Sequence, residues 1–281
     1  MGHNGTSADD IRATYDGFTE AYARIWGDDL HVGYWDAGAP DVDVPTATDR
    51  LNSELLERLV THPGDRVLDA GCGIGNPALR LARERDVSVA GVTISGYQVQ
   101  RATEAAAAAG LADRVTFSET DVRSMPFDAA WFNAVWAMES LHHVPDRAVA
   151  LTEIHRVLRP GGYLAMADFA LSRTPTGADA EVIAQFSEAG GVATLTTFEG
   201  LLADLRVAGL ELVSLTDVGD RVRPTMTRHA ELFRRARPQL EPRMGVVALD
   251  EMIKRNEELA ASPAFSYVLL AARRPVPSAS A

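Results

Sequence analysis

Short apolar runs alternate with amphipathic stretches through the middle of the chain. Five runs have the length and β-branched content of buried strands: 65–70, 87–94, 114–120, 131–138 and 162–171. Three intervening stretches carry the apolar spacing of helices: 76–85, 95–110 and 146–158. Regular alternation of strand and helix predicts a parallel sheet with helices on both faces. The pattern therefore predicts a doubly wound α/β fold.

The pattern loosens after Ser172. Segment 173–196 is rich in Gly, Ala and Thr, so we expect an insertion over the active face, with Gly190 and Gly191 forming a mobile flap. A helix is predicted at 197–209 and strands at 210–218 and 265–273. These two late strands lack a regular crossover, which indicates an antiparallel pair at a sheet edge. The stretch 223–260 is helical in pattern, and we expect three prolines to divide it: Pro224, Pro238 and Pro242.

The first 60 residues are also helical in pattern, at 8–26 and 47–60. The segment that joins these helices, 28–38, carries His31, Tyr34 and Trp35, an unusual aromatic density for a loop. Together with Tyr22, the two larger rings form either a lid over a ligand or the core that fastens the N-terminal helices.

Composition and charge limit the kinds of molecule that the chain is expected to bind. The chain has 281 residues, is 46% hydrophobic and 23% charged, and has a formal net charge of −12. That charge argues against nucleic acid or an anionic membrane as the main partner, because both need a basic surface. No apolar run reaches the about 18 residues of a membrane span, and residues 1–10 lack the features of a signal peptide. A single cysteine, Cys72, excludes an internal disulfide. We expect a cytoplasmic enzyme, monomeric or homodimeric.

The strongest chemical signal is the stretch DAGCGIG, at 69–75. Its glycines let the backbone turn tightly from strand to helix and approach a ligand that a Cβ would exclude. Phosphate binding would be disfavoured by Asp69 directly before the loop. An aspartate at that position suits a cationic group instead, such as the α-amino group of a methionine.

This stretch resembles the class I S-adenosylmethionine (SAM)-dependent methyltransferases, as do VWAMESLHHVPD at 135–146 and VLRPGG at 157–162. The resemblance runs over nearly the whole chain. Segments 18–35 and 139–147 are similar to the small-molecule methyltransferases of actinomycete natural-product pathways, such as those that O-methylate the sugar of rebeccamycin. The resemblance implies a Rossmann-like, seven-stranded, mostly parallel sheet with helical cap insertions. It also implies SAM as cofactor and S-adenosylhomocysteine as product.

On this resemblance the chain divides into four regions. Residues 1–60 form an N-terminal helical lid, and 61–172 the SAM-binding Rossmann-like core. Residues 173–275 hold the last strands of the core and the substrate-cap insertions, and 276–281 form a disordered tail.

The resemblance also assigns cofactor contacts. It places Asp69, Gly71, Cys72 and Gly73 at the amino acid part of SAM. The family usually supplies an acidic residue for the ribose at the end of the second strand, and this sequence departs from that pattern. Cyclopropane-synthase and sterol-methylating enzymes are similar in this respect, and they imply a ribose site at Thr93 and Gln98, although Gln98 is also readable as an exposed first-turn helix residue. The resemblance also implies Asp121 and Val122 as adenine contacts. Tyr34 is a further candidate contact, as part of the aromatic lid described above, with the core alternative still open.

Residues 139–143, ESLHH, lie just past a strand and so at the mouth of the sheet. Methyl transfer to an alcohol requires an aligned nucleophile and the loss of a proton, for which histidine is suited near neutral pH. Neighbouring side chains in an extended segment point in opposite directions, so we expect one histidine to face the cleft. The resemblance favours His142 as general base, and His143 in a structural role. Asp168 is then either a second acid/base or substrate-hydroxyl partner, or a simple cap.

These observations predict methyl transfer to a hydroxyl of a small-molecule natural product, on a sugar or polyketide, in antibiotic biosynthesis. Three alternatives stay open: an N-methyltransferase, a C-methyltransferase, and a methyltransferase-fold enzyme that catalyses a non-methylating reaction such as cyclisation. A metal site is not expected. Glu139 and Asp168 offer carboxylates, but the histidine pair stands where the catechol-type family has acids.

Overall fold

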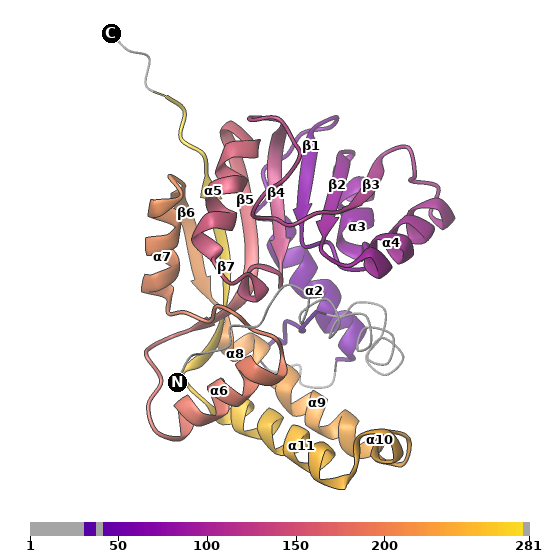
Figure 1. Cartoon of the computed structure of the whole chain (residues 1–281), viewed down its shortest axis with the longest axis vertical. Helices are drawn as coiled ribbons and strands as arrows, with labels where there is room; N and C mark the ends of the chain where they lie inside the picture. Colours follow the sequence, from indigo (N-terminus) through magenta and orange to yellow (C-terminus); the bar gives the residue numbers. More distant parts are fainter. Residues whose placement is uncertain (1–30, 38–41, 278–281) are drawn as a thin grey trace.

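The computed structural model describes residues 31–37 and 42–277, and its centre is a seven-stranded sheet. The strand order is β3-β2-β1-β4-β5-β7-β6 (Figure 1). The strands are β1 (Arg66–Ala70), β2 (Ser88–Thr93), β3 (Val115–Glu119), β4 (Phe132–Met138), β5 (Leu158–Leu171), β6 (Glu211–Asp217) and β7 (Phe265–Arg273). The first five run parallel. The order reverses between β1 and β4, the place where open α/β sheets bind ligands beyond their strand ends.

Helices cover both faces of this sheet, as the sequence predicts. On one face, α2 (Val44–Leu56), α3 (Asn76–Arg85) and α4 (Gly96–Ala108) pack against alternate strand residues in one apolar cluster. On the other, α5 (Arg147–Val157) and α7 (Phe198–Val207) bury the intervening residues in a second cluster. The Rossmann-like doubly wound arrangement is confirmed.

Local signals set the helix boundaries. Helix α3 spans the predicted range, with Gly75 before it in the left-handed region (φ 92°) and a proline in its first turn. Ser95 caps α4 by accepting a hydrogen bond from the Gln98 N–H, and Asp146 caps α5 in the same way. The predicted helix at 8–26 lies outside the described residues.

A helical cap lies at the end of the sheet where β5 finishes (Figure 1). It contains α6 (Ala178–Ala189), α8 (Gly219–Val222), α9 (Pro224–Arg235), α10 (Arg237–Met244) and α11 (Val246–Ala261). Helices α9 and α11 bury a small apolar cluster of Ala230, Phe233, Leu249 and Ile253. Pro224 and Pro238 mark the starts of α9 and α10 as expected, but Pro242 lies inside α10. The division there is made by Gly245, whose φ of 82° ends α10.

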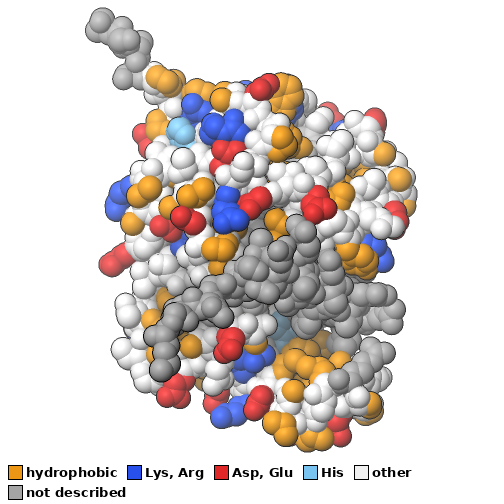
Figure 2. Space-filling view, in the orientation of Figure 1, with side chains coloured by type: hydrophobic (Ala, Val, Ile, Leu, Met, Phe, Trp, Pro, Cys, Tyr) orange, Lys and Arg blue, Asp and Glu red, His pale blue; other side chains and the backbone are white. Residues whose placement is uncertain are grey.

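The late strands refine one further expectation. They form an antiparallel pair, but β7 also pairs with β5, so only β6 lies at the edge. Eight of the nine β7 residues are buried, which explains the apolar run at 265–272. Acidic and basic side chains are interspersed over the face shown in Figure 2. Within the described ranges, none of the helices has the length and apolar character to cross a membrane.

Candidate active site

The loop after β1 is shaped by its glycines. A Cβ on Gly71 (φ +92°) would lie 2.2 Å from the Ser140 Cβ, and one on Gly75 would lie 2.7 Å from the Phe117 ring. Gly73 differs, because a Cβ there (φ +50°) meets no atom of the described residues within 4 Å. Two glycines therefore permit close packing within the protein, whereas Gly73 borders open space.

Asp69, at the start of this loop, is a buried carboxylate with an unpaired oxygen. Its side chain is 1% exposed, and Oδ2 has no hydrogen-bond partner among the described residues. Burial raises the pKa of Asp69 to about 7, and His31 opposes part of that increase. A buried oxygen of this kind is costly unless a donor or cation reaches it. Neighbouring Cys72 is also buried, and its thiol pKa is raised well above the usual value by burial and by Asp69.

The N–H groups of Gly71 and Cys72 both donate to the Val92 carbonyl, at 2.9 Å each. The loop is thereby fixed to β2. The contacts expected of these two residues must then come from their other atoms.

Thr93 and Gln98 meet at the end of β2. The Thr93 hydroxyl donates to Gln98 Oε1 at 2.6 Å, and both side chains are 6% exposed. The reading of Gln98 as an exposed helix residue is therefore wrong, because α4 turns this side chain toward β2. The structure brings the two predicted ribose contacts together.

The other predicted cofactor contacts are less concentrated. Asp121 is partly exposed and bonded to the guanidinium of Arg123, which lowers the pKa of the carboxyl. Val122 packs half-buried against the α5 side of the sheet. Tyr34 packs against the core near α2, and its N–H donates to the Ala47 carbonyl at 2.8 Å, an arrangement that matches the core alternative. Tyr22 lies outside the described residues.

The histidines lie on a single 3-10 turn, η1 (Leu141–His143), so the expectation of an extended segment is wrong. Their rings lie side by side, with centroids 3.9 Å apart. His142 is 3% exposed; its Nδ1 bonds to Asp168 Oδ1, and its N–H donates to Asp168 Oδ2 at 3.0 Å. His143 Nδ1 lies 2.9 Å from the Gly191 carbonyl. The turn thus gives each ring a different partner.

The electrostatics separate the two histidines further. Burial tends to raise the pKa of Asp168, but His142 and Arg147 together hold it below its usual value. Burial and the neighbouring His142 lower the pKa of His143 to about 3. His143 is therefore neutral near pH 7 and donates its Nδ1 hydrogen to Gly191.

Two features of this site lay beyond sequence reasoning. The segment that follows Gly190 and Gly191, the glycines of the predicted flap, is hydrogen-bonded to the histidine turn: the N–H groups of Ala193 and Thr194 donate to the His142 carbonyl at 2.9 Å each. Glu139 has a left-handed backbone (φ 46°), and its Oε1 accepts from the Val32 N–H at 3.0 Å and the Tyr267 hydroxyl at 2.9 Å. The sequence places Glu139 at the mouth of the sheet, but the only role that it suggests there is that of a metal ligand, which is not expected.

Comparison with known proteins decides the family. Residues 68–166 match the model of a methyltransferase domain. The chain is 41% identical to 27-O-demethylrifamycin SV methyltransferase from Amycolatopsis mediterranei, over 95% of this chain and 97% of that protein. It is 34% identical to (+)-O-methylkolavelool synthase from Herpetosiphon aurantiacus, over 82% and 80%. The chain belongs to the class I SAM-dependent methyltransferases.

A solved structure adds a contrast. The [4+2]-cyclase SpnF superposes with a TM-score of 0.84 and 33% identity, covering 98% of this methyltransferase and 100% of the cyclase. Similarity over the full length of a cyclase means that the fold alone does not name the reaction.

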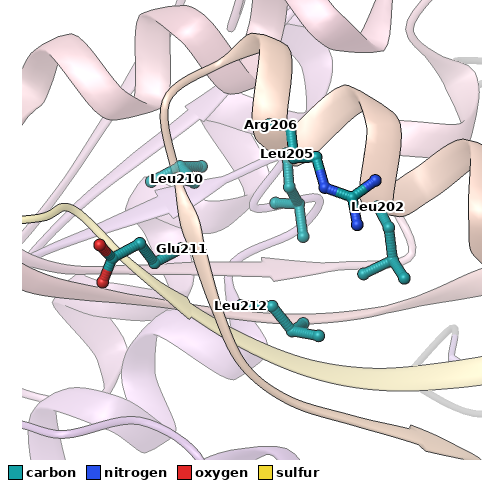
Figure 3. A pocket seen from close by; sticks show the side chains of 6 residues that line it. All are labelled: Leu202, Leu205, Arg206, Leu210, Glu211 and Leu212. Atoms are coloured by element: carbon teal, nitrogen blue, oxygen red, sulfur yellow. The ribbon is translucent and has the colours of Figure 1, made fainter.

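The residues present fit SAM. The unpaired Asp69 oxygen suits its α-ammonium group, and the open space beside Gly73 suits a close approach of the ligand to the backbone. No group of three or more His, Cys, Asp or Glu side chains in the described part of the methyltransferase is arranged to hold a metal ion. A shallow groove between α7 and β6, lined by Leu202, Leu205, Arg206, Leu210, Glu211 and Leu212, contains none of the predicted site residues (Figure 3).

Proposed function

We propose that this methyltransferase transfers the methyl group of SAM to a hydroxyl of a small-molecule secondary metabolite, with a sugar or polyketide alcohol as the acceptor. The names of the rifamycin and kolavelool relatives both specify methylation at oxygen. S-adenosylhomocysteine is the second product.

The observation that carries this proposal is the buried pair of His142 and Asp168 at the ends of β4 and β5. Asp168 accepts from Nδ1 and fixes the tautomer, which leaves Nε2 as the nitrogen that can take a proton. When bound, SAM supplies an electrophilic methyl group. His142 removes the hydroxyl proton as the new C–O bond forms, and Asp168 stabilises the resulting imidazolium.

His143 then supports the turn through Gly191. The cofactor contacts we propose are Asp69, Gly71, Cys72 and Gly73 at the amino acid end, with Thr93 and Gln98 at the ribose. Asp121 and Val122 follow at the adenine, and Tyr34 at the lid. The four-region division of the chain given above is part of the same proposal.

A cyclisation without methyl transfer is the second candidate, because SpnF matches over its full length. It is less favoured, since the chain is more similar in sequence to the rifamycin methyltransferase and a buried His–Asp pair serves the deprotonation of an alcohol. An amine or carbon acceptor would use the same cofactor site.

The test mixes the protein with SAM and a panel of glycosides, aglycones and amines, and follows S-adenosylhomocysteine release and product mass. We expect a gain of one methyl group at oxygen, matched by equal release. His142→Ala and Asp168→Asn should each lower kcat by about 10² to 10⁴-fold, the usual contribution of a general base. The control is His62→Ala, whose side chain is 74% exposed and which should leave kcat unchanged.

Other outcomes decide against the proposal. Methylation of an amine with little loss in His142→Ala would identify an N-methyltransferase. A methyl group on carbon would identify a C-methyltransferase. A rearranged product of unchanged mass, formed without release, would identify a cyclase.

A further inference from the structure

Residues 31–35, here called the strap, connect the cofactor end of the sheet to the cap. Val32 and Trp35 are buried, at 4% and 3% exposed, and Val32 belongs to the main apolar cluster. A Cβ on Gly33 would lie 2.7 Å from the Ala47 Cβ, so the strap lies tightly against α2. The strap is thus a packed element with defined contacts on both sides.

One end of the strap is held by Glu139. Its Oε1 accepts from the Val32 N–H at 3.0 Å and from the Tyr267 hydroxyl at 2.9 Å, and its Oε2 lies 3.9 Å from His31 Nδ1. Hydrogen bonds to a carboxylate are among the stronger ones in proteins. This carboxylate therefore joins the strap to β7 at the end of β4.

The other end is held by α9. The Thr225 hydroxyl oxygen accepts from the Gly33 N–H at 3.0 Å and from Trp35 Nε1 at 2.8 Å. The backbone N–H of Trp35 donates to the carbonyl of Arg221, in the neighbouring helix α8, at 2.8 Å. Thr225 is fully buried, so water does not compete for these bonds. Loss of either anchor should loosen the same five residues.

The strap adjoins the amino acid end of the SAM site. Ser140, the residue after Glu139, donates to the Ala70 carbonyl at 2.6 Å and lies against Gly71. From the strap, His31 is close enough to Asp69 to oppose the increase in its pKa. Glu139 keeps a left-handed backbone although it is not glycine, and such strain is found where a side chain must be held in one place.

We propose that Glu139 is a positioning residue for SAM. It acts through the strap, which its carboxylate holds in place at the amino acid end of the cofactor pocket. This role goes beyond the proposed acceptor chemistry, since it concerns cofactor retention alone and is independent of the substrate that is methylated.

The test measures S-adenosylhomocysteine affinity by calorimetry and backbone amide exchange in the strap, on the full chain without acceptor. Glu139→Ala should weaken binding by about 10-fold, the value of one or two lost hydrogen bonds, and speed exchange at Val32 and Gly33. Glu139→Gln keeps an accepting oxygen and should stay within about threefold of the native affinity. Thr225→Val, at the far anchor, should weaken binding by about 5-fold and also speed exchange.

The control is Glu251→Ala, on the exposed side of α11, which should change neither quantity. If Glu139→Ala does not fold, Glu139→Gly removes the same carboxylate and relieves the left-handed strain. Weaker binding in Glu139→Ala with native affinity in Thr225→Val would show that Glu139 acts on the cofactor directly, which overturns the role of the strap. Native exchange rates at Val32 in Glu139→Ala would overturn it as well. Because no acceptor is present, a wrong assignment of the methylated atom cannot produce either result.

Discussion

The two halves of the site, at the ends of β1–β2 and of β4–β5, are built in different ways. In the cofactor half, backbone hydrogen bonds to the Val92 carbonyl fix the glycine loop. The acceptor half is collected from distant parts of the chain. His142 and Asp168 are 26 residues apart, and His143 and Gly191 are 48 apart.

This difference predicts which measured quantity a substitution in each half of the site should change. A loop fixed by backbone geometry is sensitive to the volume and dihedral angles of its residues, so changes there should act on SAM affinity. A site held by side-chain hydrogen bonds is sensitive to single donors and acceptors, so changes there should act on kcat or on acceptor KM.

The largest expected effect is in the glycine loop. Gly71→Ala combines a left-handed backbone with a contact of 2.2 Å to Ser140, and should lower the free energy of unfolding by about 2–5 kcal/mol. Gly64→Ala is the matched control, because its φ is also positive (+83°) and its Cβ meets nothing. It should cost only about 1 kcal/mol. Equal losses in chemical denaturation would show that the contact with Ser140 is relieved by relaxation.

Gly73→Ala isolates the ligand side of the same loop. An added Cβ at position 73 meets no atom of the described residues within 4 Å, so the stability of Gly73→Ala should match that of Gly64→Ala. The SAM affinity of Gly73→Ala should fall by 10-fold or more, which is a loss of at least about 1.4 kcal/mol of binding free energy. Calorimetry on both variants checks this difference. Native affinity in Gly73→Ala would place the ligand elsewhere.

The next effect concerns pH. With its pKa near 7 in the free protein, Asp69 must lose a proton before it can pair with an ammonium group. SAM affinity should therefore rise as pH rises toward 7, by at most tenfold per pH unit, and level off above it. The sign for stability is opposite: because the folded-state pKa is raised, stability without ligand should fall as pH rises from 3.8 to about 7.

Asp69→Asn should bind SAM weakly with a flat profile over that range. Proton release on binding, measured by calorimetry in buffers of different ionisation enthalpy, checks the native protein. His31 and Cys72 also face Asp69, so His31→Gln is the necessary second variant. If the profile of Asp69→Asn keeps its slope, Asp69 is not the titrating group.

The same contrast explains what the sequence could predict. The run of glycines after β1, the helix α3 and the proximity of Thr93 and Gln98 show in residues that are close together along the chain, so their sequence pattern is local. The 3-10 turn at His142, the approach of 190–196 and the anchoring of Val32 by Glu139 depend on how distant segments fold together. Hydrophobic periodicity carries no information about such contacts. The expected division at Pro242 is wrong, because Pro242 lies inside α10, although proline disfavours a helix interior.

A smaller effect should distinguish the two histidines. His143→Asn keeps a donor at the position of Nδ1 and should remain within about threefold of native activity, whereas His143→Leu loses the bond to Gly191, worth about 1 kcal/mol. We expect the leucine variant to raise acceptor KM a few-fold with little change in kcat, because the flap is loosened. Steady-state kinetics on both variants checks this. A fall in kcat comparable to that of His142→Ala would make His143 the base.

The smallest effect lies at the opposite end of the strands, where neither half of the site reaches. The central carbon of the Arg66 guanidinium lies 4.1 Å from the centre of the Trp131 ring. Arg66 is the first residue of β1, and Trp131, which is 42% exposed, directly precedes β4. Trp131→Leu should cost about 0.5–1 kcal/mol of stability, and Trp131→Phe less, because a ring is kept. Thermal unfolding measures that loss, and kcat/KM for SAM and acceptor should stay native in both variants. A drop in kcat/KM would mean that the register of β1 against β4 is set from this end, since these two strands carry the glycine loop and the histidine turn. The two halves of the site would then be coupled through the sheet, and the prediction that substitutions in each half change different quantities would be wrong.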